Sequence, residues 1–135
     1  MFHSQDSPWV NWAMRGAKFK LLSVDPKTGR FTILIKSAPG VIAPMHRHIG
    51  AVEAFVIEGG FHYHDDPSIR FTAGSYLLEK EGAVHQPITP EGAVLLATFY
   101  GPVEGLDAQN NVTGCIDWKW HVDAWNAAGG NYVIS

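Results

Sequence analysis

Turn signals recur along this chain of 135 residues about every eight to twelve positions. Clusters of Gly, Pro, Asp and Asn separate short apolar runs, as at residues 25–29, 65–67 and 90–92. The runs between them, such as residues 30–36 and 93–100, are rich in Phe, Ile, Val, Leu and Thr. No segment shows a sustained helical period over eleven or more residues. This pattern of short apolar runs separated by turns predicts an all-β single domain, either a sandwich or a closed barrel.

Two histidines and a glutamate lie in the glycine-bounded stretch of residues 40–60. His46 and His48 are two positions apart, so on one strand their side chains point to the same face. Glu53 has the wrong parity for that face and would lie about 17 Å from His48 on a straight strand. Glu53 can therefore join them only if the chain reverses at Gly50, where positive φ carries no steric cost. The spacing predicts a hairpin with an antiparallel partner strand over residues 53–58, ended by the glycine pair at 59–60.

A third histidine, His85, follows the turn signal at residues 80–82. Three imidazoles and a carboxylate suit a divalent metal ion such as Fe(II), Mn(II), Ni(II), Co(II) or Zn(II). We therefore predict a metal site formed by His46, His48, Glu53 and His85. In octahedral geometry these four ligands leave two adjacent positions open for a substrate.

The chain holds a second His-x-His pair, His62 and His64. This pair is followed by Asp65-Asp66-Pro67, which is a turn signal, and no suitably placed glutamate accompanies it. We interpret these two histidines as the exposed face or end of a hairpin. The comparison indicates that His-x-His by itself does not identify a metal site.

With these residues in place, the chain resembles the cupin family. The first cupin motif is matched by Gly40, His46, His48, Glu53 and Gly60, and most of the second by Gly74, Gly82 and His85. Lys80 stands where the second motif has proline, and Thr89 stands where it has asparagine. The resemblance implies a double-stranded β-helix, or jelly-roll barrel, with a divalent metal. We expect one domain over residues 1–135, with the barrel at about 18–100 and a C-terminal extension at 101–135.

Within the cupins, the chain looks most similar to the small single-domain group related to acetylacetone dioxygenase and the ChrR cupin domain. The features that suggest this lie at residues 20–30, 38–46 and 56–59. Acetylacetone dioxygenase uses three histidines without a motif glutamate, so Glu53 departs from its pattern. Cupins resembling this chain are commonly dimers, and the resemblance therefore implies a homodimer.

The leading functional hypothesis is a non-haem Fe(II) dioxygenase that cleaves a small dicarbonyl or hydroxyketone. The metal would stabilise the enolate of a chelating substrate, which O₂ then attacks. Two alternatives stay open, because one fold hosts many reactions. The first is a non-oxidative isomerase, decarboxylase or lyase using Zn(II), Mn(II) or Ni(II). The second is a non-catalytic sensor of a metal or ligand.

Any acid or base must lie beside the metal, and the sequence offers only weak candidates for this role. They are Tyr63, Tyr76, Glu79 and His62. A substrate pocket needs apolar side chains inside the barrel. The residues predicted to form it are Phe55, Ile57, Tyr76 and Phe99.

The formal charge of −3 gives no electrostatic case for nucleic acid or an anionic membrane as a partner. The sequence contains no run of eighteen apolar residues, which is the length that would indicate a membrane span. The first residues lack a basic and apolar leader pattern, and Cys115 is the only cysteine, so no internal disulfide can form. We therefore expect a cytoplasmic protein whose partner is a small-molecule substrate.

The last third of the chain has a different pattern. Residues 103–114 are rich in Gly, Asp and Asn and predict a loop. Residues 116–123 alternate apolar and polar, which predicts a strand. That strand would bury Trp118, Trp120 and Val122 and expose Asp117, Lys119, His121 and Asp123. It would pack on the barrel as a terminal strand, or serve as a lid or subunit contact near the barrel mouth.

Overall fold

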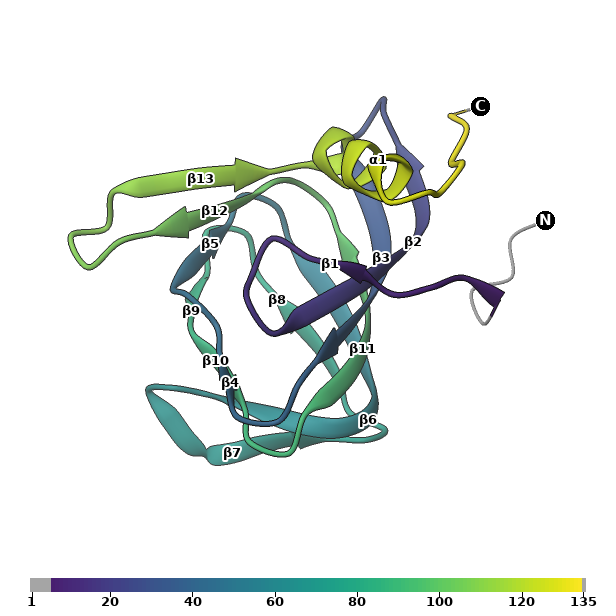
Figure 1. Ribbon diagram of the computed structural model, residues 1–135. Helices are drawn as coiled ribbons and strands as arrows, with labels where there is room; N and C mark the ends of the chain where they lie inside the picture. The colour runs from purple at the N-terminus through teal and green to yellow at the C-terminus, as the bar shows by residue number, and fades with distance from the viewer. Residues whose placement is uncertain (1–5, 135) are drawn as a thin grey trace.

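Two curled antiparallel sheets form the molecule in this computed structural model, which describes residues 6–134 (Figure 1). The larger sheet has nine strands, with β7 and β8 also pairing with β6 alongside the main order β1-β2-β3-β11-β6-β10-β4. Its strands are β1 (Val10–Asn11), β2 (Ala17–Asp25), β3 (Arg30–Ser37), β4 (Val41–Ile42), β6 (Val52–Tyr63), β7 (Asp66–Thr72), β8 (Tyr76–Glu79), β10 (Pro87–Thr89) and β11 (Ala93–Phe99). The predicted all-β class is confirmed.

The smaller sheet has four strands in the order β13-β12-β5-β9. They are β5 (His46–His48), β9 (Val84–His85), β12 (Val103–Leu106) and β13 (Val112–Ile116). The hairpin of β12 and β13 extends away from the barrel (Figure 1). Residues 103–114, predicted as a loop, therefore contribute to two strands and the turn between them.

Apolar side chains of the larger sheet fill the barrel because they alternate along each strand. On β3, Phe31, Ile33 and Ile35 point inward and are buried, while Thr32 and Leu34 between them are half-buried. Phe19 and Leu21 of β2 are fully buried in the same core. Period-two alternation places one face of each strand in the core, as the sequence pattern predicts.

The strand β6 changes partners at its glycine pair. Before Gly59 it pairs with β11 and β8, and after it with β7 and β10. Gly59 has φ of +66°, and a Cβ there would lie 2.0 Å from the carbonyl oxygen of Gly92. Glycine is the residue that tolerates this φ and this approach. The prediction that the strand ends at residues 59–60 is wrong, since these glycines bend the strand and let it continue.

The C-terminal segment forms helix α1 (Trp118–Ala127), which packs against β2 (Figure 1). Asp117 caps the helix, because its carboxylate accepts a hydrogen bond of 2.8 Å from the backbone N–H of Trp120. His121, Val122 and Trp125 are buried. The predicted strand at residues 116–123 is therefore wrong over most of its length, and His121 is inside rather than exposed.

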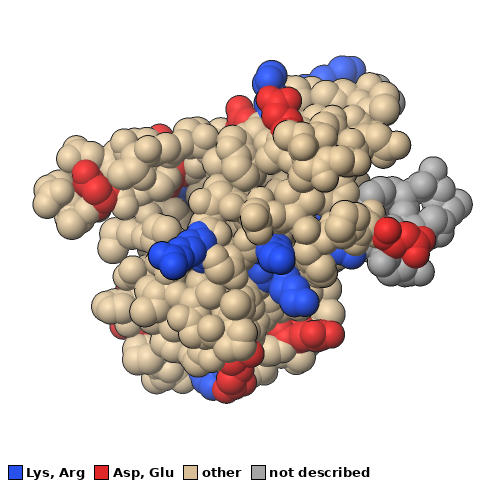
Figure 2. All heavy atoms as spheres, viewed as in Figure 1, with Lys and Arg blue, Asp and Glu red and all other residues tan. Residues whose placement is uncertain are grey.

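On the face drawn in Figure 2, charged side chains lie scattered among uncharged ones, with no continuous basic area. Within residues 6–134, no helix is long and apolar enough to span a membrane.

Candidate metal centre

The three predicted histidines converge where β5 meets β9. The two strands are antiparallel, with His46 directly opposite His85. The turn before β9 is tied to β5, because Gly82 N–H donates to the carbonyl of His48 at 2.7 Å. Gly82 has φ of +80°, which allows the tight reversal between β8 and β9. Backbone pairing thus positions all three imidazoles at one end of the barrel.

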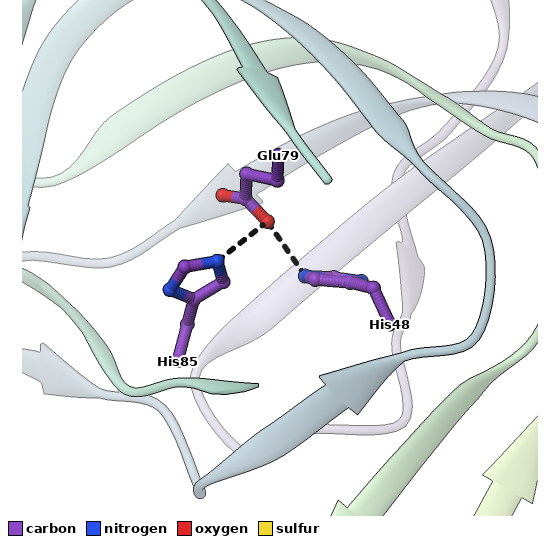
Figure 3. Close-up of side chains that lie close together, drawn as sticks. All are labelled: His48, Glu79 and His85. Carbon is purple, nitrogen blue, oxygen red and sulfur yellow. Dashed lines mark ion pairs between the residues drawn. The ribbon is translucent and has the colours of Figure 1, made fainter. Parts of the chain in front are cut away.

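The carboxylate at this cluster belongs to Glu79, the last residue of β8. Its Oε2 lies 2.7 Å from Nε2 of His48 and 3.5 Å from Nε2 of His85 (Figure 3). One ligand atom from each of these three residues lies within 4.8 Å of the other two. Glu79 faces inward because it shares the buried face of β8 with Leu77. The sequence identified Glu79 only as a weak acid or base candidate.

Glu79 is largely buried, and burial alone would raise the pKa of its carboxyl group. The hydrogen bond and charge of His48, the hydroxyl of Tyr63 and the charge of His85 outweigh burial, so the pKa is lowered. Tyr63 donates its hydroxyl to Glu79, and burial together with that carboxylate raises the pKa of Tyr63. The Tyr63 ring also stacks on His85, with centroids 4.4 Å apart. Glu79 is therefore an ionised, oriented carboxylate.

The backbone just before β5 orients the ring of His46. Its Nδ1 lies 3.0 Å from the carbonyl oxygen of Pro44, and a carbonyl only accepts, so Nδ1 carries the proton. This tautomer leaves the Nε2 lone pair available for a metal, as in many metal-binding histidines. Burial lowers the pKa of His46 to about 4, so the ring is neutral at pH 7. Its ring centroid lies 4.8 Å from that of His48.

The donor set fits a divalent ion. Among the described residues, two buried side-chain nitrogens have no hydrogen-bond partner, and both are here: His48 Nδ1 and His85 Nε2. Buried polar atoms in proteins are normally satisfied, so such atoms require a ligand or other explanation. Neutral imidazoles and one carboxylate are ligands that Fe(II), Mn(II), Ni(II), Co(II) and Zn(II) accept. Burial also lowers the pKa of His85, which favours the neutral form that binds metals.

Glu53 does not join this cluster. On β6, Val52 and Ala54 point inward, so Glu53 between them points outward. Its two carboxylate oxygens accept hydrogen bonds of 2.7 Å from Tyr76 and Tyr100 on the outer surface. These bonds, Tyr100 first, lower the pKa of Glu53.

The predicted hairpin that was to bring Glu53 back is also not formed. Strand β5 pairs with β9 and β12 in the smaller sheet, while β6 belongs to the larger one. Gly50 connects two sheets rather than two paired strands. A Cβ at Gly50 would lie 2.5 Å from the backbone of Tyr100, so a close backbone contact, and not the positive φ expected from the sequence, requires glycine here.

A cavity of about 310 Å³ opens beside the metal centre and extends through the barrel. Of the predicted pocket residues, Phe99 lines it and packs near His48, with ring centroids 6.0 Å apart. Phe55, Ile57 and Tyr76 instead lie on the outer face, with 44%, 43% and 59% of their surfaces exposed. Along β6 and β8 these three residues alternate with the inward-facing ones. The prediction therefore placed them on the wrong face of their strands.

The second histidine pair lies in the β6–β7 hairpin, as the sequence indicated. His62 is half-buried and its Nδ1 lies 3.1 Å from the carbonyl of Tyr63, while His64 is exposed at the turn. Within residues 6–134, the metal-type donor cluster contains neither of them.

A curled β-barrel with imidazoles and a carboxylate at one end is the arrangement of a metal-dependent cupin. The chain belongs to the family of the ChrR cupin-like domain, whose model matches residues 1–104. It is 28% identical over 116 residues to an acetylacetone-cleaving enzyme from Acinetobacter johnsonii, covering 83% of this chain and 76% of the relative.

Solved structures have the same fold. An acetylacetone dioxygenase from Acinetobacter johnsonii superposes with a TM-score of 0.85 and 25% identity, covering 94% of this chain and 91% of that one. An RmlC-like cupin protein from Ralstonia eutropha JMP134 gives a TM-score of 0.86 at 24% identity, covering 93% of this chain and 83% of that one. The likeness to the Ralstonia eutropha protein shows the fold alone.

Proposed function

We propose that this chain is an Fe(II)-dependent dioxygenase that cleaves a small dicarbonyl or hydroxyketone. The observation that carries the proposal is the buried cluster of His48, Glu79 and His85, with His46 beside it, facing an apolar cavity. The similarity to an acetylacetone-cleaving enzyme supports the reaction class. When bound, the metal would supply Lewis-acid stabilisation of the substrate enolate and the redox chemistry with O₂.

The chain's own residues would hold and surround that ion. His46, His48 and His85 would be the nitrogen donors, and Glu79 would be either a fourth donor or the acceptor that orients His48. As an ionised carboxylate, Glu79 can also take the proton that a dicarbonyl loses on enolisation. Tyr63 would hold that carboxylate in place through its hydroxyl.

The cavity walls would exclude water from the reacting centre. Phe99 packs near His48 and stacks on Phe31, with centroids 4.8 Å apart and planes 8° from parallel. Val52 and Ala54 of β6 line the same space. An apolar, dry environment strengthens electrostatic interactions at the centre and suits an uncharged organic substrate.

A non-oxidative metal-dependent isomerase, decarboxylase or lyase is the second candidate. The Tyr63–Glu79 pair favours it, because a carboxylate and a phenol next to the imidazoles can move a proton without O₂. Zn(II), Mn(II) or Ni(II) would serve such an enzyme.

Oxygen uptake separates the two candidates. The Fe(II)-loaded protein is mixed with small β-diketones in an oxygen electrode, and the Zn(II)-loaded protein is the control. The dioxygenase predicts stoichiometric O₂ consumption only with iron. Substrate conversion without O₂ consumption by either form would favour the second candidate and contradict the first.

A further inference from the structure

The cavity carries one feature that the metal centre does not explain: an unpartnered hydroxyl at its far end. Ser37 is the last residue of β3, and it follows Phe31, Ile33 and Ile35 on the inward face. It lines the cavity and is only 7% exposed. Within residues 6–134, its hydroxyl group forms no hydrogen bond.

Ser37 and the metal centre lie toward opposite ends of the barrel. Phe31 stacks on Phe99, which is the neighbour of His48, so the start of β3 is at the metal end. Ser37 is six residues further along the same strand, roughly 20 Å from Phe31 at about 3.3 Å per residue. Residues of both ends line the same cavity.

The polar neighbour of Ser37 is already occupied. Thr89 is also buried at this end, and its hydroxyl donates to the carbonyl of Ala38 at 3.0 Å. The Trp12 indole, which lines the cavity too, donates its Nε1–H to His121 at 3.0 Å. Ser37 is therefore the group at this end whose proton is free for a ligand.

The rest of the cavity sets the charge that a ligand can carry. Among the described lining residues there is no Lys and no Arg, and Glu79 is the only carboxylate. Glu79 is already bound by His48 and Tyr63. A carboxylate, phosphate or ammonium group in the part of a ligand that lies away from the histidines would be buried without a partner, which is strongly unfavourable.

On the basis of the proposed function, we propose that the substrate is an elongated, uncharged dicarbonyl with an oxygen acceptor in its tail, bound by the Ser37 hydroxyl. The chelating end would lie at the histidines and the tail along the apolar walls. Ser37 would then determine specificity for the tail without touching the reacting atoms. A neutral hydrogen bond of this kind gives about a fivefold preference in Kd.

The test uses calorimetric binding to the Fe(II)-loaded protein under anaerobic conditions, so that no turnover occurs. Three β-diketones are compared, each with an unbranched tail long enough to reach from the histidines to Ser37: one with a plain alkyl tail, one with an ether oxygen replacing a methylene near the end of that tail, and one with a terminal carboxylate. Wild-type protein should bind the ether diketone about fivefold more tightly than the one with the plain alkyl tail. It should show no binding of the carboxylate.

Ser37→Ala should remove the ether preference while the Kd of the diketone with the plain alkyl tail and the iron content stay unchanged. Ser37→Thr, which keeps a hydroxyl group, should retain part of the preference, and Ser68→Ala on the exposed β7 is the matched surface control. An ether preference that persists in Ser37→Ala, or equal binding of the carboxylate diketone, would overturn the inference. Selective binding without O₂ consumption on aeration would overturn the proposed function alone, and no binding of any diketone would overturn both.

Discussion

Nε2 of His48 and Oε2 of Glu79 lie 2.7 Å apart at one end of the barrel, buried from solvent. The second close imidazole, His85, places its Nε2 3.5 Å from the same oxygen. The centre therefore consists of a carboxylate held between two imidazoles, and that carboxylate is Glu79 rather than Glu53.

Replacing Glu79 and Glu53 by glutamine tests this assignment with one and the same chemical change. Glu79→Gln should lower metal affinity by about 10- to 100-fold, because it removes the charge that contacts His48 and His85. Glu53→Gln should leave metal affinity unchanged, because its side chain contacts only Tyr76 and Tyr100 on the outer surface. Metal titration of both variants is the measurement, and equal losses in the two would refute the assignment.

Replacing His48 by alanine should abolish tight metal binding while the barrel still folds. The core is built from Phe19, Leu21, Phe31 and their neighbours, and it does not depend on the metal centre. Metal content after dialysis measures the loss of metal binding, and the far-UV circular dichroism spectrum shows whether the barrel still folds. An unfolded His48→Ala protein would mean that the metal is structural.

The pH dependence of stability should reflect His121. This residue is fully buried, and burial lowers its pKa from 6.5 to about 4. Below pH 6.5 the unfolded chain binds a proton there that the folded chain does not, so stability is lost as pH falls from 6.5 toward 4. The loss from this one group reaches up to about 3 kcal/mol.

His121→Gln can keep the contacts to Trp12 and to the carbonyl of Asp117 while removing the titration. Urea denaturation at pH 7 and pH 4.5 should show a smaller pH effect in the variant than in the wild type. The variant should keep part of the effect, since burial also lowers the pKa of His46 and His85. An unchanged pH effect would show that His121 is not a buried neutral residue.

The homodimer stays a prediction, and we expect the outer face of β6 and β8 to form it. Phe55, Ile57, Tyr76 and Leu78 are each between 43% and 59% exposed there. The carboxylate of Glu53 in this face is already bound by two tyrosine hydroxyls. Exposed apolar areas of this kind commonly mark interfaces, and most such assemblies are two-fold symmetric.

Light scattering after gel filtration measures the mass directly. Leu78→Asp should shift the protein from dimer to monomer, whereas Ile69→Asp on the exposed β7 should not. A wild-type monomer would contradict the prediction, and a dimer insensitive to Leu78→Asp would place its interface elsewhere.

Turn chemistry and alternation were enough to predict the all-β fold and the approach of His48 to His85, whereas the metal-binding role of His46, His48 and His85 stays a prediction. His46 and His48 follow from their two-residue spacing, and His85 follows from the turn at Gly82. The odd spacing of five residues places Glu53 on the opposite strand face from His48. Glu53 was assigned to the metal site only because a hairpin was assumed at Gly50, and that hairpin is not formed. The same parity rule places Glu79 on the inward face with Leu77, a signal that could have identified it.

The C-terminal helix shows the limit of short periodic patterns. Trp118, Trp120 and Val122 alternate like a strand, yet the buried residues of α1 are His121, Val122 and Trp125, which is helical spacing. Asp117 as an N-cap was the available signal. Buried His121 accepts a hydrogen bond from Trp12, 109 positions away, and such a distant contact is not visible in a local pattern.

The most direct test of the account is the metal content of protein purified without added metal. Inductively coupled plasma mass spectrometry should find close to one divalent ion per chain, predominantly iron, in the wild type and in Glu53→Gln. The same measurement should find almost none in His48→Ala. A metal-free wild type that also fails to bind added Fe(II), or a His48→Ala variant with full metal content, would contradict the account.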